Sequence, residues 1–276
     1  MMRLRGGRPG RFTPVAGLFV LIGAMGAAWL AWHPAPLPEP PAVTIPAGDV
    51  AFRPAGDFRF GNRGVNAPLR HEVAAYPLRA MIWHVTEADY FRCVAAKACR
   101  PADATGSSAD HPVTGVSFLD ATAYAGWFAA RTGQDWRLPS DRDWVRLAAE
   151  RAPADLLIGP SDDPSRRWLE RYRDEAAQRG AADGTLRQSG SFGRNSLGVA
   201  DLGGNVWEWT TACQIAAKVN AAGTVLESQD YCGVRVVEGR HRTFLVDFIR
   251  NPRSGGCSAG LPPDFVGFRL VRDVAD

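Results

Sequence analysis

Residues 201–210 read DLGGNVWEWT and place one carboxylate between two large aromatic side chains. Trp207 and Trp209 are two positions apart, so in an extended segment they share a face and Glu208 points to the other. A carboxylate held among aromatics needs partners, because burying an unpaired charge is unfavourable. The pattern therefore predicts a fixed role for Glu208, either in binding a cation or in a buried hydrogen-bond network.

The start of the chain has the composition of a membrane-directed segment. Residues 15–32, VAGLFVLIGAMGAAWLAW, carry no charge and follow an arginine-rich start at residues 1–14. At about 1.5 Å per residue the run spans roughly 27 Å, close to a bilayer core. We expect an uncleaved transmembrane anchor in the bacterial inner membrane, because the run is long and lacks a clean Ala-x-Ala site. A cleaved signal peptide is the alternative. The arginines predict a cytoplasmic N-terminus and a periplasmic remainder.

The remaining charges argue against one class of partner. Removing the four arginines of the N-terminal segment from the 32 basic residues leaves 28, against 29 acidic residues. A nucleic-acid binder needs a basic face, so no nucleic-acid partner is expected. Residues 33–42 are proline-rich and predict a stiff linker. No second linker or repeat follows, so one domain is expected over residues 43–276.

Three Ser/Thr-x-x-Asp motifs predict the starts of helices, because such pairs form capping boxes. They are Thr86–Asp89, Ser117–Asp120 and Ser140–Asp143. The second helix should end near Gly133, which suits a left-handed C-cap. A fourth, charged helical stretch is expected over residues 165–179. With 29 glycines and 20 prolines in the chain, loops should dominate the rest of a loop-rich α+β domain.

Several segments together resemble one protein family. HPVTGVSFLDATAYAGWFAARTGQDWRLPSDRDWVRLAA (111–149), NSLGVADLGGNVWEWT (195–210) and GFRLVRD (267–273) resemble the hallmark segments of formylglycine-generating-enzyme-like proteins, also called sulfatase-modifying-factor domains. TIPAG near residue 44 and VTEADYFRCV fit the family's opening, so the resemblance covers roughly residues 43–273. It implies a single α+β domain with a C-type-lectin-like core and much irregular chain.

The resemblance also implies a structural calcium site. By position, its ligands are the side chains of Asp201 and Glu208 and the carbonyls of Gly204 and Val206. Such a mixture of hard oxygens suits calcium, and glycine lets the backbone turn its carbonyls inward. The alternative is that Glu208 only accepts backbone hydrogen bonds. The family's other calcium site has no convincing match.

The chain lacks the residues that carry out the family's oxidative chemistry. Formylglycine-generating enzymes oxidise a substrate cysteine with copper held by two cysteines, placed between an R-V strand and the GFR segment. Here no cysteine stands between Cys232 and Cys257, so at least one copper position lacks sulfur. The iron motif H-x-x-x-H-x-E of the sulfoxide-forming relatives is also missing from the sequence. Neither copper nor iron is therefore expected.

The five cysteines predict pairs with one left over, because the compartment is oxidising. Cys93 and Cys99 are six residues apart at a predicted helix end and can form a local disulfide. Related domains often carry cysteines at the places of Cys213 and Cys232, which suggests a second bridge. Cys257 is then the odd thiol, either buried and inert or reactive beside His241. Another possibility pairs Cys257 with Cys213 or Cys232.

Residues 238–250, EGRHRTFLVDFIR, gather charges of both signs around one histidine. This cluster forms either a salt-bridged face or a polar cleft, and the cleft residues would be Glu238, Arg242, Asp247 and Arg250. His241 is the only histidine in the presumed pocket and is the candidate general base or metal ligand.

Two functions compete. The first is a binding or maturation module that holds a periplasmic protein or peptide in the family's substrate groove. A further resemblance, in GVRV-E-G-x-H-R and GGC…PPD…GFRLVR, to accessory proteins of copper nitrite reductases favours a redox enzyme as the partner. The second is an oxidoreductase with copper or iron bound by Cys257, His241 and Asp247. Residual formylglycine-generating activity is the least favoured alternative.

Overall fold

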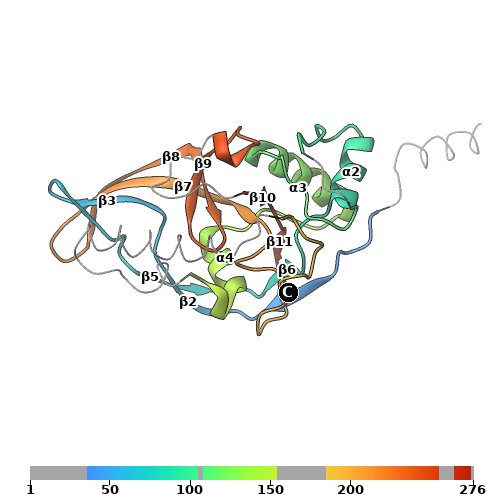
Figure 1. The fold of residues 1–276 in the computed structure, drawn as a ribbon. Helices are drawn as coiled ribbons and strands as arrows, with labels where there is room; N and C mark the ends of the chain where they lie inside the picture. The colour runs from blue at the N-terminus through green and yellow to red at the C-terminus, as the bar shows by residue number, and fades with distance from the viewer. Residues whose placement is uncertain (1–35, 105–107, 154–184, 255–263, 275–276) are drawn as a thin grey trace, which may run out of the picture. The chain divides into compact units, whose positions relative to one another are not determined.

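The computed structural model describes residues 36–104, 108–153, 185–254 and 264–274. The chain from Pro38 onward forms one compact unit. It combines three helices with three small sheets among its described residues, which confirms the expected α+β class (Figure 1).

The largest sheet joins segments that are far apart in the chain. Its strands follow the order β4-β3-β7-β8-β9, and β10 pairs in parallel with the start of β7. Their bounds are Gly56–Phe60 (β3), Arg63–Val65 (β4), Trp207–Val219 (β7), Val225–Glu238 (β8), Thr243–Val246 (β9) and Val266–Gly267 (β10). β7 and β8 are long, and Figure 1 shows them reaching away from the helices together with β3.

Two smaller sheets complete the strands. One has the order β1-β6-β11 and brings the two ends of the domain together, and the other pairs β2 with β5. Their bounds are Ala42–Ile45 (β1), Gly48–Phe52 (β2), Arg70–Ala74 (β5), Leu78–Met81 (β6) and Val271–Asp273 (β11).

All three predicted helices form where their capping boxes place them. They are α2 (Glu87–Ala95), α3 (Phe118–Thr132) and α4 (Asp141–Ala148). Gly133 ends α3 with φ of 67°, in the left-handed conformation that glycine adopts without strain. Two short 3₁₀ turns, Ala149–Arg151 and Pro252–Ser254, complete the helical elements.

The helices pack the domain through large side chains. Trp144 of α4 shares a buried cluster with strand residues from two of the sheets. Tyr124 of α3 stacks on Tyr90 of α2 at 5.8 Å between ring centroids and meets the edge of Phe268 at 5.4 Å. Because Phe268 belongs to the closing GFR segment, α3 braces that segment against the rest of the core.

Two predicted helical segments fall outside the described residues. These are the expected membrane anchor at residues 15–32 and the charged stretch at residues 165–179. None of the helices in the described part of the chain is long and apolar enough to cross a membrane.

Both expected disulfides are present. Cys93 is bonded to Cys99, and Cys213 to Cys232 across β7 and β8. The alternative pairing of Cys257 with Cys213 or Cys232 is therefore wrong. Cys257 itself lies outside the described residues.

Candidate functional site

Glu208 lies at the start of β7 and is held by an arginine and a histidine in the core. Its carboxylate accepts two hydrogen bonds from Arg269, at 2.7 Å from Nε and 2.8 Å from Nη2. His84 Nε2 lies 3.0 Å from Oε1 of the same carboxylate. All three side chains are almost completely buried. The DLGGNVWEWT segment therefore contributes Glu208 to a buried ion-pair network. The main hydrogen-bond donor to this carboxylate is the side chain of Arg269 and not the backbone N–H groups.

The hydrogen atoms of this network can be assigned by counting donors. The two hydrogens on Arg269 Nη2 go to Glu208 Oε1 and to the Ala200 carbonyl at 2.9 Å. Nη1 donates to the Ile82 carbonyl at 3.0 Å. Arg269 Nη2 also lies 3.1 Å from His84 Nε2, but both hydrogens of Nη2 are already donated to oxygen atoms. We therefore assign His84 Nε2 as a donor to Glu208. Every carboxylate oxygen of Glu208 is paired.

The network predicts sensitivity to acid. Burial opposes ionisation of Glu208, but the charges of Arg269 and His84 outweigh it and lower the pKa of Glu208 to about 2. The pKa values of Asp120 and Asp143 are lowered too, because neighbouring arginines outweigh burial. A depressed folded-state pKa adds stability that is present above the unfolded value and is lost as the pH falls through the folded value.

The melting temperature of the full chain should therefore fall steeply as the pH drops from about 4.5 to 2. For Glu208 alone the lost stabilisation is about 3 kcal/mol. Calorimetry from pH 7 to pH 2 measures the melting temperature, with Glu208→Gln as the control. This variant should start lower and lose less over the same range. Parallel melting curves for the two proteins would contradict the assignment.

Asp201 ties two loops together through backbone groups. Its side-chain oxygens accept the N–H groups of Gly190, at 2.5 Å, and of Phe192, at 2.8 Å. Its own backbone is left-handed, with φ of 61°. Asn205 acts in the same way on the other side of the turn, because its amide both donates to and accepts from the backbone of Arg187. The turn before β7 is thus fastened by side chains.

These contacts do not fit the expected calcium site. Both oxygens of Glu208 accept hydrogen bonds from the Arg269 guanidinium, and a dication beside that guanidinium would be repelled. Both oxygens of Asp201 already accept N–H groups. Gly204 also has another function, because a Cβ there would lie 2.5 Å from the Phe192 ring. Glycine at position 204 therefore makes room for an aromatic ring, and Val206 is buried beside it.

A second buried network contains two of the predicted cleft residues. Arg242 donates to Glu238 at 2.7 Å and to Asp141 at 2.8 Å. Burial raises the pKa of Glu238 well above its usual value, the nearby Asp141 adds to this, and Arg242 opposes it only in part. Glu238 has no exposed surface, so Glu238 and Arg242 join β8 to the start of α4 rather than lining a cleft.

Arg250 organises the loops around the start of α3. Its guanidinium makes two bonds of 2.7 Å to Asp120, which is also the capping carboxylate of α3. The same guanidinium pairs with Asp103 and donates to the Pro101 carbonyl at 2.9 Å. Arg250 therefore fixes the chain after β9 to the first turn of α3 and to the loop that precedes this helix.

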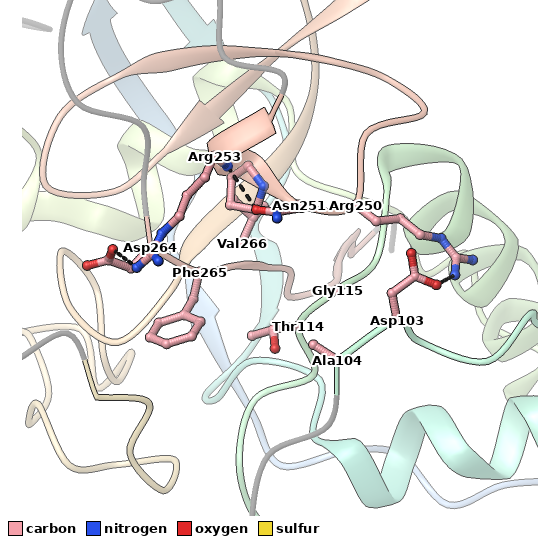
Figure 2. Close-up of a pocket in the computed structure, with 11 residues that line it drawn as sticks. Asp103, Ala104, Thr114, Gly115, Arg250, Asn251, Arg253, Asp264, Phe265 and Val266 are labelled. Atoms are coloured by element: carbon pink, nitrogen blue, oxygen red, sulfur yellow. Dashed lines mark hydrogen bonds and ion pairs between the residues drawn. The ribbon is translucent and has the colours of Figure 1, made fainter.

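A cavity of about 540 Å³ opens beside this arginine. Three chain segments line it, the first before α3, the second after β9 and the third entering β10. Its described lining residues are Asp103, Ala104, Thr114, Gly115, Arg250, Asn251, Pro252, Arg253, Asp264, Phe265 and Val266. Figure 2 shows two ion pairs on opposite sides of the cavity, Arg250–Asp103 and Arg253–Asp264, with Thr114 between them and the Phe265 ring next to the second pair.

Of the predicted cleft residues, only Arg250 lines this cavity. Asp247 directly follows β9, where its N–H donates to the Gly233 carbonyl at 3.0 Å. The His241 ring meets the edge of Trp207 at 5.4 Å, and its carbonyl accepts the Trp207 indole N–H at 3.0 Å. The predicted cleft therefore combined residues that are close in the chain but that the fold places in different surroundings.

Comparison with known proteins shows which family the chain belongs to. A family profile described as the sulfatase-modifying factor enzyme 1-like domain matches residues 32–274. The chain belongs to this family. The formylglycine-generating enzyme of Mycobacterium tuberculosis (strain ATCC 25618 / H37Rv) is 36% identical over 110 residues, which are 37% of this chain and 34% of that protein.

Two further relatives extend the comparison. Hercynine oxygenase from the same strain is 33% identical over 111 residues, 38% of this chain and 22% of that protein. The matches thus span about a third and a fifth of the two curated relatives. The structure of PvdO from Pseudomonas aeruginosa superposes with a TM-score of 0.53 at 18% identity, over 85% of this chain and 95% of that one. This structural likeness supports the fold alone.

In this sulfatase-modifying-factor domain, two of the hallmark segments bind each other. Glu208 comes from GNVWEW and Arg269 from the closing GFR, and both lie inside the family match. The two segments are recognisable in the sequence, but the pairing of Glu208 with Arg269 and His84 was not predicted from it. One signal in the sequence could have indicated this pairing. A carboxylate in the core requires a cation, and Arg269 stands between the apolar residues Phe268 and Leu270.

Proposed function

We propose that the domain is a binding or maturation module that holds an extended segment of a partner polypeptide in the cavity beside Arg250. The observation that carries this proposal is the lining of the cavity. Three apolar residues, Phe265, Pro252 and Val266, line it together with the residues of two ion pairs. Its volume of about 540 Å³ is within the range of pockets that bury a ligand of several side chains.

The chemistry of the lining favours a peptide of mixed character. Apolar side chains of the peptide would cover Phe265 and Pro252. Arg253 and Asp264 are both solvent-exposed, so their ion pair is worth only about 0–1 kcal/mol. It can therefore open at little cost and pair with charges of the partner. Arg250 is held too tightly by Asp120 to do the same, and it keeps the cavity wall in place.

We further propose that the domain works on the periplasmic side of the bacterial inner membrane. The family match begins at residue 32, where the apolar run of residues 15–32 ends. Two disulfides suit an oxidising compartment. A periplasmic redox enzyme is the proposed partner.

A peptide-binding experiment tests the function. The full chain is presented with a displayed library of random decapeptides, and the affinities of the enriched peptides are measured by titration. Ala104→Trp places an indole in the cavity from an exposed position and should weaken binding at least tenfold. Phe91→Ala, on the exposed face of α2, is the matched control and should not change it. The proposal fails if no peptide is enriched, or if the enriched peptides bind Ala104→Trp as well as the unchanged chain.

The second candidate is an oxidoreductase with a rebuilt metal centre. It is favoured by the name of one relative, hercynine oxygenase, and by the position of Cys257 in the chain between two cavity-lining residues, Arg253 and Asp264. Elemental analysis of the full chain, purified without chelator, separates the candidates. Stoichiometric copper or iron that is lost in Cys257→Ala or His241→Ala would show a metal centre built from these residues and would favour the oxidoreductase. The same sample tests calcium, and its melting temperature should not respond to a chelator.

A further inference from the structure

The two disulfides have different surroundings. Cys93 is completely buried, so the first bridge has one sulfur sealed in the core. The second bridge lies in the β7–β8 hairpin, where Cys232 is exposed and Cys213 is half-buried. The Arg235 guanidinium stands 3.1 Å from Cys213 Sγ. Cys232 is therefore the more exposed cysteine of this bridge, and a cation stands beside the sulfur of the other.

Arg235 is held at that place by independent contacts. Its Nη1 donates to the Thr211 carbonyl at 2.8 Å, and its guanidinium lies 4.1 Å from the centroid of the Phe118 ring. In the strand register Arg235 is directly opposite Cys213. The positive charge is therefore fixed before any chemistry takes place, and a thiolate formed on Cys213 needs no rearrangement to be stabilised.

We propose that Cys213–Cys232 is a thiol–disulfide exchange site whose substrates are thiols. A substrate thiolate attacks Cys232 Sγ, a bond forms between the two sulfurs, and the Cys213–Cys232 bond breaks. Cys213 leaves as a thiolate beside Arg235. A second substrate thiolate then attacks the mixed disulfide and releases Cys232 as a thiolate. Two substrate thiols are oxidised to one disulfide, and the protein bridge gains two electrons.

Arg235 gives this exchange a direction. Exchange is faster when the leaving thiolate is better stabilised, and the Arg235 guanidinium stands beside Cys213 Sγ. Attack on Cys232 therefore has the better leaving group. In the Cys93–Cys99 bridge, by contrast, Cys93 is completely buried. This bridge serves as the internal comparison.

The hairpin can keep its fold while the bridge is open. β7 and β8 pair on both sides of it, from Glu208 opposite Glu238 to Lys218 opposite Glu227. β9 begins to pair with β8 only at Val234. No described strand therefore covers the outer edge of residues 225–232, and a substrate thiol can approach Cys232 from that edge.

Reduced glutathione is the probe that tests the proposal. The oxidised full chain is incubated with it, samples are quenched in acid over time, and adducts are located by mass mapping. The Cys213–Cys232 bridge should open first, with glutathione attached to Cys232. Arg235→Met keeps the apolar stem without the charge and should slow the opening about tenfold. Arg235→Lys should restore most of the rate.

Arg92→Gln is the matched control, because Arg92 is an exposed arginine next to Cys93. It should leave the opening of both bridges unchanged. Near-ultraviolet circular dichroism checks that Arg235→Met remains folded. The proposal is overturned if the two bridges open equally fast, if glutathione attaches to Cys213, or if Arg235→Met reacts like the unchanged chain. None of these results bears on peptide binding in the cavity.

Discussion

Replacing Arg269 with methionine should lower the free energy of unfolding by about 3–5 kcal/mol. The substitution keeps the length of the side chain but leaves the Glu208 carboxylate buried without its main cation. Removing one partner of a buried ion pair is more damaging than removing both, because the remaining charge stays desolvated. For a domain of this size the melting temperature should fall by about 10 °C. Chemical denaturation of the full chain, with its disulfides intact, measures the change.

A double-mutant cycle separates the pair from the packing around it. Glu208→Gln with Arg269→Met removes both charges, and its loss should be clearly smaller than the sum of the two single losses. Arg272→Met is a matched control, because Arg272 is the next arginine along the same segment and pairs with the exposed Glu39. It should be clearly less destabilising than Arg269→Met, because the carboxylate that it leaves behind, Glu39, stays exposed to water. If Arg269→Met were no more destabilising than this control, the network would not hold the core.

Local signals in the sequence predicted local structure well. Three capping boxes placed the helix starts, and Gly133 placed the end of α3. The disulfide between Cys93 and Cys99 follows from their short separation. These features depend on residues within a few positions of one another, so the sequence contains all the information that decides them.

Long-range partners could not be predicted in the same way. Glu208 meets Arg269 across 61 positions and His84 across 124. The sequence of the GNVWEW segment suits both a calcium site and a buried hydrogen-bond network, and only the contacts in the fold distinguish the two. The cavity has the same difficulty, because its walls come from three distant segments. The prediction of a cleft from the charged residues 238–250 was misleading for a related reason. Neighbours in the chain, Glu238 and Arg250, point into different networks.

Gly56→Ala should be almost as damaging as the loss of Arg269, for a purely steric reason. A Cβ at this position would lie 1.9 Å from the Ile215 carbonyl oxygen, which is backbone and cannot swing away. The backbone of Gly56 also has φ of 153°, a conformation that residues with a Cβ rarely adopt. The expected loss is about 3–5 kcal/mol, or failure to fold. Chemical denaturation measures this loss as well.

Gly64→Ala in the neighbouring strand β4 is the matched control. A Cβ there meets no atom within 4 Å, so this variant should keep its stability within about 1 kcal/mol. The difference matters because β3 pairs with β7 only from Gly56 to Arg59. Displacing Gly56 therefore frees both β3 and β4 from the largest sheet. Hydrogen exchange should show lost protection in β3 before β8. Equal stability of the two variants would mean that the parallel pairing of β3 with β7 is not as close as the structure places it.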